Sequence, residues 1–381
     1  MQSTLRHTRV AFSVTNCICN DQRVLKIAET VSKLNCDITI IGRKSGACCN
    51  SGTVPFNTHR FNMIFKRGFP FYAFFNLRLF VFLLLHRYDL LVSNDLDTLL
   101  PNYLVSKLKN LPVVYDSHEY FTGVPELQKR PFVRWIWKII EKSIFPELKH
   151  VMTVSDSIAI QYEKEYGLRP DVVRNCSMNS EDINPFSRKE LDINPVHLLL
   201  ILQGTGINVD RGGIELIDAV SLTDAVSLLI VGAGDHFELL KERVLIKGLT
   251  GRIKLVPKCP WQILMRYTRS ADAGLSLDKN SNMNYNFSLP NKIFDYLSAG
   301  IPVISTDLHE ISRILNEFSC GILIPEPAPE EIRKAIVRLR DDRDMLVELK
   351  RNSAIASGTL NWKNESLKVI ELYRTVLKLS S

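Results

Sequence analysis

Residues 201–219 read ILQGTGINVDRGGIELIDA, an apolar β run that stops at Gly204-Thr205-Gly206 and a helix that begins after Arg211-Gly212-Gly213. In doubly wound parallel sheets such a turn lies at the carboxyl end of a strand, where these sheets bind ligands. Glycines let the backbone approach a phosphate, the helix N-terminus offers free N–H groups, and Arg211 adds a cation with bidentate reach. The spacing is not the dinucleotide-binding fingerprint, and glycines that merely close a tight turn remain an alternative.

The alternation of short apolar runs and helical patterns continues on both sides of this turn. Such alternation predicts right-handed crossovers and parallel sheets covered by helices. In the first half, strands are expected at 10–14, 38–41, 89–93, 112–115 and 150–154, and helices at 22–34, 69–87, 98–109, 131–144 and 155–166. In the second half, strands are expected at 197–203, 226–232, 252–256, 272–277 and 301–305, and helices at 212–221, 235–247, 260–269, 290–298 and 327–340.

A polar stretch, NCSMNSEDINPFSRKELDINP (175–195), separates the two series and contains two Asn-Pro pairs. At 381 residues the chain is too long for a single ordinary core. We therefore expect an α/β protein of two Rossmann-like, doubly wound domains that face each other across a cleft. The first is expected over 1–180 and the second over 181–361, with an amphipathic helix over 362–381 that returns to the first domain.

The composition is that of a globular protein, with 45% hydrophobic and 23% charged residues. The net charge of +7 fits an anionic small-molecule substrate or an anionic membrane surface. No basic run with interleaved aromatic residues suggests nucleic acid as a partner. The eight cysteines lack the spacing of a zinc site, and no secretory signal opens the chain, so free thiols and a cytoplasmic location are expected.

Residues 69–92, FPFYAFFNLRLFVFLLLHRYDLLV, are long and apolar enough to span a bilayer. Arg78 lies in the middle of the run, and His86-Arg87 interrupt its far end, which makes insertion costly. The favoured interpretation is a buried or groove-lining helix followed by a buried strand. A helix that lies in the membrane interface and a true span are the alternatives.

A second motif, SLPNKIFDYLSAG (288–300), predicts a helix that begins near Pro290 and ends at Gly300. Lys292 and Asp295 are three residues apart and share one face of its first turn. A cation beside free N–H groups suits a diphosphate, and a carboxylate one turn deeper suits a sugar diol. An ordinary exposed ion pair on a helix is the alternative.

Six segments in order resemble the retaining nucleotide-sugar glycosyltransferases of family 4, which have the GT-B fold. They are YDSHEYF (115–121), VMTVSDSIAIQY (151–162), VVRN (172–175), ILQGTGINVDRGG (201–213), LLIVGAG (228–234) and LPNKIFDYLSAGIPVIS (289–305). The segment NDQRVLKIAETVSKLNCDITII (20–41) also resembles the family's first helix and second strand. The resemblance extends over nearly the whole chain.

The resemblance implies which residues bind the donor. The family's basic residue that grips the donor diphosphate falls on Arg211, and its asparagine–lysine pair falls on Asn291 and Lys292. The helix carboxylate that binds the donor ribose falls on Asp295. With Gly204, Gly206, Gly212 and Pro290, these residues make up the expected donor site. Arg211 and Lys292 are also expected to act in catalysis.

Two departures from the family pattern leave one role open. The first of the family's two glutamates, which contacts the donor sugar, falls on Phe287, so Asn284, Asn286 and Ser288 are only candidates for that role. Thr205 stands where some members have a third basic residue. These departures keep a non-catalytic, sugar-nucleotide-binding protein as an alternative.

The resemblance implies that the first domain binds the acceptor, a glycan or a lipid-linked sugar. Its loops supply the expected acceptor contacts Asn20, Arg23, Glu119 and Tyr120. The family's histidine over the transferred sugar falls on His118, although a lone loop histidine is more often structural. Basic and aromatic residues near 65–75 suit an acceptor with a lipid, or contact with the inner face of the plasma membrane.

The resemblance also implies the chemistry, which is transfer of a sugar to a hydroxyl of a bacterial surface polysaccharide or glycolipid. Basic side chains and helix dipoles would stabilise the leaving diphosphate, so neither a metal nor a cofactor is expected. The nucleotide sugar, linked to UDP or GDP, is a substrate. Asp95-Leu96-Asp97 has the form of a D-x-D metal motif but lies at a strand end of the other domain.

Two other enzyme classes are alternatives for a chain of this pattern. A nucleotide-sugar epimerase of the same fold would need a carboxylate and histidine set for proton abstraction, which these loops do not supply. A nicotinamide-dependent oxidoreductase would need a glycine-rich first turn. The first turn, SVTNCICNDQRV, contains no glycine, which argues against an oxidoreductase.

Overall fold

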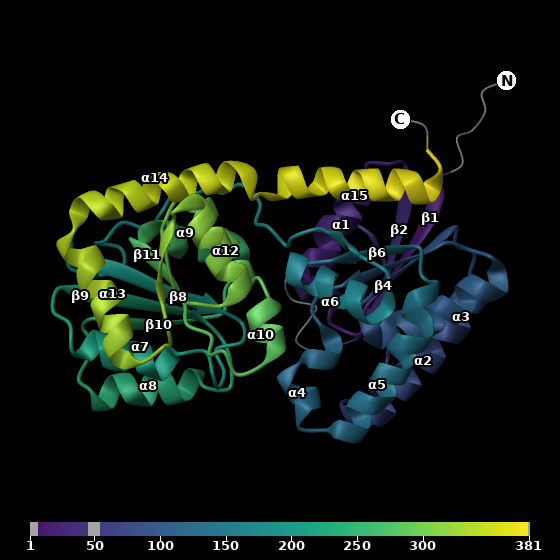
Figure 1. The fold of residues 1–381 in the computed structure, drawn as a ribbon, viewed down its shortest axis with the longest axis horizontal. Coiled ribbons are helices and arrows are strands. Elements are labelled where there is room, and N and C mark those ends of the chain that lie inside the picture. Colours follow the sequence, from purple (N-terminus) through teal and green to yellow (C-terminus); the bar gives the residue numbers. More distant parts are fainter. Residues whose placement is uncertain (1–6, 45–53, 380–381) are drawn as a thin grey trace. The chain divides into compact units, whose positions relative to one another are not determined.

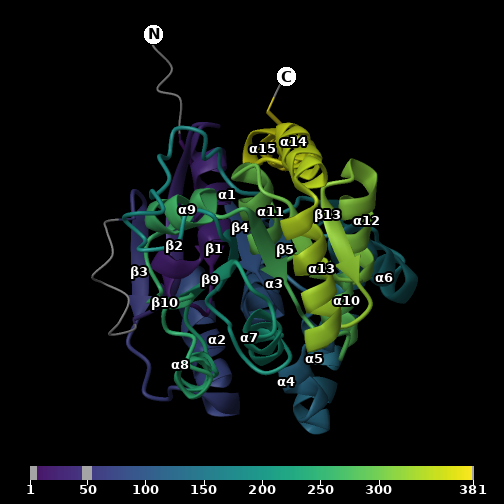
Figure 2. The same ribbon diagram turned by 90° about the vertical axis from the view of Figure 1, so that its left-hand side faces the viewer.

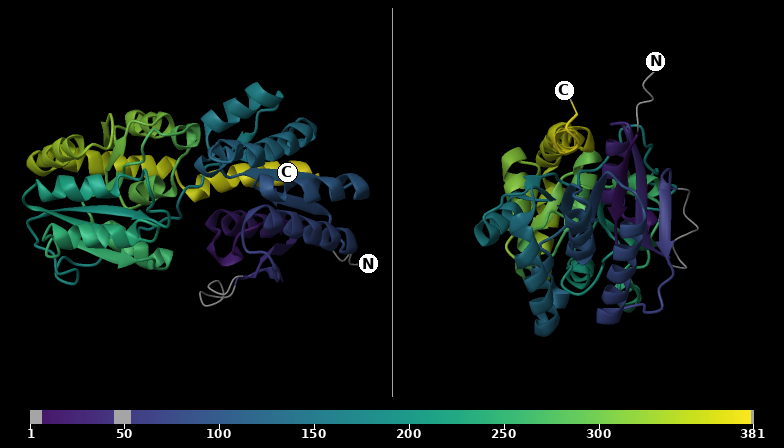
Figure 3. Two further views of the ribbon diagram at one scale, coloured as in Figure 1. Left: turned by 90° about the horizontal axis from the view of Figure 1, so that it is seen from below. Right: turned by 90° about the vertical axis from the view of Figure 1, so that its right-hand side faces the viewer.

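The computed structural model describes residues 7–44 and 54–379. The chain divides into two compact units (Figure 1). Unit 1 consists of Met1–Arg174 together with Glu365–Ser381, and unit 2 consists of Asn175–Asn364. Each unit is a parallel sheet with helices packed against it, as Figures 2 and 3 show from further directions.

The sheet of unit 1 has seven strands in the order β3-β2-β1-β4-β5-β6-β7, all parallel. The strand order reverses between β1 and β4, where doubly wound sheets bind ligands. The strands are β1 Thr8–Ser13, β2 Cys36–Arg43, β3 Asn57–Phe61, β4 Leu90–Asn94, β5 Val113–Ser117, β6 His150–Thr153 and β7 Asp171–Val172.

Unit 1 has helices on both faces of its sheet. The longer ones are α1 Gln22–Ser32, α2 Gly68–Leu85, α3 Leu99–Lys109, α5 Pro131–Ile144, α6 Asp156–Tyr166 and α15 Trp362–Leu377. Ala11 of β1 belongs to a buried cluster with residues of α2 and α3. The neighbouring Phe12 stacks on Tyr373 of α15. Because successive residues of a strand point to opposite faces, α15 covers the face opposite to α2 and α3.

The apolar run at 69–92 forms α2 followed by β4, so the predicted helix and strand are confirmed. The helix is only partly buried. Phe71, Phe75, Leu79 and Leu83 are its buried residues, spaced by four and therefore on one face. The remaining surface of α2 is partly or fully exposed although it is apolar.

Unit 2 repeats the arrangement with six parallel strands in the order β10-β9-β8-β11-β12-β13. They are β8 Leu198–Gly204, β9 Val226–Gly232, β10 Ile253–Pro257, β11 Ala273–Ser276, β12 Val303–Thr306 and β13 Gly321–Ile324. The helices are α7 Gly213–Ser221, α8 Phe237–Ile246, α9 Trp261–Ser270, α10 Met283–Phe287, α11 Asn291–Ser298, α12 His309–Phe318, α13 Pro329–Asp341 and α14 Arg343–Thr359. The strand order reverses between β8 and β11, beside the glycine turn.

Buried contacts tie α15 to unit 1. Glu365 is 3% exposed and accepts a hydrogen bond of 2.9 Å from the backbone N–H of Arg174. Val369 and Tyr373 are fully buried. The last helix therefore completes the core of the first unit, as Figure 1 shows with α15 beside α1.

The expectation of free thiols holds for the cysteines at 19, 36, 176, 259 and 320. It is wrong for Cys17, which is disulfide-bonded.

Candidate functional site

The glycine turn after β8 is open at its start and tightly packed at its end. A Cβ added to Gly206 would meet nothing nearer than the Asn208 Nδ2, 3.9 Å away, which leaves room for a ligand. Gly212 has a φ of +69° and an added Cβ would lie 2.5 Å from the Cβ of Leu277. Gly212 is therefore required by the packing of the turn against the end of β11, whereas a Cβ added to Gly204 or Gly206 would make only an ordinary contact at 4.0 or 3.9 Å.

Arg211 and Lys292 converge on a third residue, Asp278, which lies two positions after the end of β11. The Arg211 Nη1 lies 2.9 Å from one carboxylate oxygen of Asp278, and the Lys292 Nζ lies 3.5 Å from the other. The Arg211 guanidinium also lies 4.4 Å from the ring centroid of Tyr285 in α10. The two predicted phosphate-binding cations thus share one buried counter-charge.

Burial and neighbouring charges oppose each other at Asp278 and Lys292, which together with Arg211 form a charged triad. Asp278 is 2% exposed, and burial opposes its ionised form. Lys292 and Arg211 outweigh that effect and lower the pKa of the Asp278 carboxyl. Burial lowers the pKa of Lys292, although Asp278 opposes the change. Lys292 is only 12% exposed, so it is not the exposed helical ion pair that the sequence left open.

The N-terminus of α11 lies in the same region, because Lys292 is its second residue. Pro290 precedes the helix in an extended conformation and no side chain caps it. The exposed Asn291 accepts a hydrogen bond of 2.9 Å from the Asn175 Nδ2. The first turn thus keeps backbone N–H groups and the positive end of the helix dipole beside the Lys292 ammonium. These are the properties of an anion-binding site.

The C-terminus of α11 confirms the predicted end of the helix. Gly300 has a φ of +69°, and its N–H bonds the carbonyl of Leu297. The N–H of Ile301 bonds the carbonyl of Tyr296. This pair of bonds is a Schellman motif, which requires the left-handed residue that glycine supplies.

Asp295 lies one turn inside α11 and is 7% exposed. Its carboxylate accepts hydrogen bonds from the Ser177 hydroxyl, from the Trp261 Nε1 at 3.1 Å and from the Gln203 Nε2 at 2.8 Å. The protein itself fixes the orientation of this carboxylate.

The candidates for the sugar-contacting role at Phe287 make local contacts. Phe287 ends α10, and Asn284 in the same helix is 4% exposed. The Asn286 Oδ1 accepts a hydrogen bond of 2.9 Å from the backbone N–H of His309. The Ser288 hydroxyl donates to the carbonyl of Asn284. The geometry singles out none of the three.

In unit 1, His118 follows β5 and lies between two carboxylates. Its Nδ1 is 3.3 Å from Asp95, and its Nε2 is 3.2 Å from Asp116. Burial favours the neutral imidazole, but the two carboxylates outweigh it and raise the pKa of His118 to about 10. Asp95, the first residue of the D-x-D segment, also accepts the backbone N–H of His118 at 2.8 Å.

Arg23 holds the second carboxylate from the other side. Its Nε and Nη2 donate to Asp116 at 2.9 Å and 2.6 Å, and its Nη1 donates to the carbonyl of Val173 at 2.8 Å. Arg23 is 3% exposed and Asp116 is fully buried. Arg23 therefore orients Asp116, and through it His118, with no part of its guanidinium directed to solvent.

The other predicted acceptor contacts are Tyr120, Glu119 and Asn20, of which the first two differ in their burial and in their hydrogen-bond partners. Tyr120 is 4% exposed, and its hydroxyl donates to Glu165 in α6. Glu119 is half-buried, and its carbonyl accepts the Ser117 hydroxyl at 2.8 Å. Asn20 ends the short 3₁₀ helix Ile18–Asn20, and its side chain lies outside the described part of the structure.

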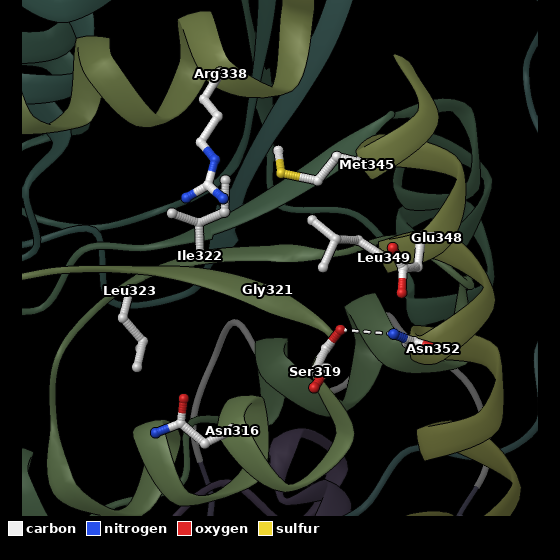
Figure 4. Close-up of a pocket in the computed structure, with 10 residues that line it drawn as sticks. All are labelled: Asn316, Ser319, Gly321, Ile322, Leu323, Arg338, Met345, Glu348, Leu349 and Asn352. Atoms are coloured by element: carbon white, nitrogen blue, oxygen red, sulfur yellow. Dashed lines mark hydrogen bonds between the residues drawn. The ribbon is translucent and has the colours of Figure 1, made fainter. Parts of the chain in front are cut away.

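A cavity of about 340 Å³ lies elsewhere in unit 2, along the edge strand β13 (Figure 4). Residues of β13, α13 and α14 line it, with the Asn352 amide bonded to the carbonyl of Ser319 at 2.9 Å. None of the predicted donor residues lines this cavity. Within residues 7–44 and 54–379, no group of three or more His, Cys, Asp or Glu side chains is placed to hold a metal ion.

Asp278 and the partners of Asp295 are functional residues that the sequence does not predict. Asp278 could have been found by its position, because polar residues just after a parallel strand lie where these sheets bind ligands. The partners Ser177, Gln203 and Trp261 come from three separate segments, so no local pattern reveals them.

Two sequence families match the chain. The model described as Glycosyltransferase Family 4 matches residues 22–176, and the model described as Glycosyl transferases group 1 matches residues 209–342. A curated relative, chitobiosyldiphosphodolichol beta-mannosyltransferase of Candida albicans, is 23% identical over 267 residues, or 63% of this chain and 57% of that protein. The matched part therefore spans little more than half the length of that relative.

Two solved structures share the fold. Sucrose-phosphate synthase from Thermosynechococcus elongatus superposes with a TM-score of 0.80 at 16% identity, over 98% of this chain and 100% of that chain. Anabaena Alr3699/HepE in complex with UDP-glucose superposes with a TM-score of 0.75 at 15% identity, over 97% and 100%. With both halves matched and two parallel-sheet units of this fold, the chain belongs to the family 4, group 1 glycosyltransferases with the GT-B fold.

Proposed function

We propose that the chain is a retaining, metal-independent glycosyltransferase that uses a nucleotide sugar as donor and a glycan or glycolipid hydroxyl as acceptor. The observation that carries the proposal is the convergence of Arg211 and Lys292 on Asp278 beside the N-terminus of α11. Two cations and free N–H groups at the carboxyl edge of the sheet match a diphosphate in charge. The complex of Anabaena Alr3699/HepE with UDP-glucose supports a UDP-linked donor as the first to test.

The proposed reaction breaks the bond between the anomeric carbon and the diphosphate oxygen. The acceptor oxygen forms its bond to the same face of the sugar, and its proton passes to the departing phosphate oxygen. Arg211, Lys292 and the N–H groups of α11 stabilise the charge that develops on the leaving group. Fixed charges of this kind are usually the largest catalytic contribution.

Asp295 would bind a hydroxyl of the donor ribose, with its carboxylate oriented by Ser177, Gln203 and Trp261. His118 would hold the transferred sugar, with its orientation set by Asp95, Asp116 and Arg23. Since Asp95 and Asp116 retain the proton on the imidazole, His118 would act as a hydrogen-bond donor and a positive charge and not as a base.

We further propose that the protein works in bacterial surface polysaccharide or glycolipid synthesis at the inner face of the plasma membrane. The proposed location at the membrane is supported by helix α2, which is apolar but only partly buried. The curated relative is by its name a beta-mannosyltransferase that acts on chitobiosyldiphosphodolichol, a lipid-linked sugar, which supports a lipid-linked acceptor.

The test is donor binding and turnover of the full chain and of Lys292→Ala. A panel of UDP, GDP, ADP, CMP and NAD, with Mg²⁺ or EDTA, should give a thermal shift with one nucleoside diphosphate that EDTA does not remove. At a hundredfold excess over Kd the stabilisation is about 2.7 kcal/mol. We expect Lys292→Ala to lower turnover by about 10²–10³-fold. The matched control is Lys241→Ala, which alters a surface lysine of α8 and should leave nucleotide binding and turnover unchanged.

Each alternative predicts a different result. Binding without turnover, with every acceptor class, would favour a sugar-nucleotide-binding protein. Interconversion of the free nucleotide sugar without transfer would favour an epimerase. Loss of the shift and of turnover in EDTA would refute metal independence, and a shift with NAD alone would refute the transferase.

A further inference from the structure

Helix α2 has apolar residues on all sides but is buried on only one. The buried face packs against β1, β2, β4 and α3 through a core cluster that includes Ala11, Ile41, Leu91 and Val105. The opposite face exposes Phe69 at 61%, Leu77 at 61%, Val81 at 44% and Leu85 at 75%. Leu77, Val81 and Leu85 are spaced by four residues and form one stripe, and Phe69 is exposed at the start of the helix. Only 22% of the helix is buried, although its length and composition suit a membrane.

A second apolar stripe lies on α5. Phe132, Trp135 and Ile139 are 69%, 58% and 45% exposed, at positions i, i+3 and i+7 of the helix. The rings of Tyr72 in α2 and Trp137 in α5 lie 5.5 Å apart in an edge-to-face contact, which joins the two helices. Figures 1 and 2 show α2 and α5 reaching the same end of unit 1.

The two sequence stretches that carry these stripes contain basic but no acidic residues. No Asp or Glu occurs between Asp37 and Asp89, and none between Glu126 and Glu141. Exposed basic side chains precede and follow the helices, namely Lys66, Arg67, Arg87, Lys129 and Arg130. An apolar stripe with aromatic residues and a basic rim matches an anionic lipid surface, in which the apolar side chains enter the acyl region and the cations contact phosphate groups.

We propose that the exposed stripes of α2 and α5, with their basic rim, dock unit 1 on the surface of an anionic bilayer. The helix α2 lies in the interface and does not cross it, because its other face is part of the core of unit 1. The proposal deepens the membrane location given above but does not depend on which sugar is transferred.

The test is co-sedimentation of the full chain with vesicles of neutral phosphatidylcholine, with and without anionic phosphatidylglycerol. We expect binding to the anionic vesicles that weakens with salt. The double substitution Leu77→Glu/Val81→Glu places two carboxylates on the stripe and should weaken binding at least tenfold. Lys66→Gln/Arg67→Gln should weaken it about 25-fold, from roughly fivefold per basic residue. The matched control Leu245→Glu/Ile246→Glu alters exposed apolar residues at the end of α8 in unit 2 and should bind as the wild type does.

Several outcomes would overturn the proposal. Equal sedimentation of the wild type and Leu77→Glu/Val81→Glu would exclude the stripe, as would no binding to either vesicle. A dimer in solution that the double substitution converts to a monomer, without vesicle binding, would make a second copy the occupant. Resistance to extraction by alkaline carbonate would indicate a span. The nucleotide thermal shift, measured on the same samples, separates these results from failure of the proposed transferase activity.

Discussion

Asp278 holds two cations that must later accept a diphosphate, and this arrangement gives a sharp prediction for Asp278→Asn. The substitution keeps the shape of the side chain but removes its charge. At an effective dielectric of 20, the attraction over 2.9 Å to Arg211 and over 3.5 Å to Lys292 is roughly 6 and 5 kcal/mol before desolvation is subtracted. Removing one partner of a buried pair costs ~3–5 kcal/mol.

We expect a loss of about 3 kcal/mol in the free energy of unfolding, at the low end of that range, because the Arg211 side chain is 29% exposed and can be rehydrated. A bound nucleoside diphosphate supplies the missing negative charge. Its affinity should therefore rise about tenfold in the variant, which adds roughly 1.4 kcal/mol to the stabilisation at saturating ligand.

The assay is urea unfolding of both proteins with and without a saturating nucleoside diphosphate. Asp272→Asn is the matched control, because Asp272 also lies between an arginine and a lysine of unit 2. Its carboxylate is 2.7 Å from Arg188 and 2.8 Å from Lys350. This control should lose stability without any change in nucleotide affinity.

Two results would refute the reasoning. An Asp278→Asn protein as stable as the wild type would show that the carboxylate does not hold the two cations. Equal nucleotide affinity in Asp278→Asn and Asp272→Asn would show that the ligand does not bind at the triad.

Three further predictions concern single residues. His118 has a raised pKa of about 10 in the folded state, so its charge stabilises the fold fully below its unfolded pKa of 6.5 and less as pH rises towards 10. His118→Gln should therefore lower the free energy of urea unfolding more near pH 6 than near pH 10. An equal loss at both pH values would contradict the carboxylate contacts. Burial lowers the pKa of Lys292, so nucleotide affinity measured by calorimetry should fall on the alkaline side at a lower pH than for an ordinary lysine; a fall only where free lysine titrates would contradict this. Gly212→Ala adds a Cβ 2.5 Å from Leu277 and should lower Tm and abolish the thermal shift with nucleotide. The control Gly248→Ala has a similar φ and no neighbour within 4 Å, so it should lower the free energy of unfolding by only about 1 kcal/mol. Equal effects of the two substitutions would exclude the close contact.

The sequence predicted best those elements whose signal is local. The central strands are nearly continuous apolar runs, and the helix at 290–298 carries its own start and stop residues, so both were found. The strand β3, with sequence NTHRF, was missed because it is a largely exposed edge strand without an apolar run. Helix α14 was missed because few of its residues are buried, and its apolar residues have no clear period.

The residues of the candidate site likewise divide into those with a local sequence signal and those without one. Arg211 and Lys292 were predicted because a cation beside a glycine turn or a helix start is a local pattern. Asp278 was not predicted, since its role arises only when β11 and α11 come together. Arg23 and Tyr120 were expected to face an acceptor, but both are buried, because a loop sequence does not say which way its side chains point.

The discontinuity of unit 1 has a consequence for synthesis in the cell. A ribosome makes Met1–Arg174 first but adds α15 only after all of unit 2. Until then Phe12 lacks its ring contact with Tyr373, and the backbone N–H of Arg174 lacks its hydrogen bond to Glu365. One face of the sheet in the nascent first unit is therefore uncovered, whereas all residues of the second unit are already present. We therefore expect the unit that is made later to complete its fold first, and the unit that is made earlier to remain incomplete in a form that chaperones or proteases can recognise.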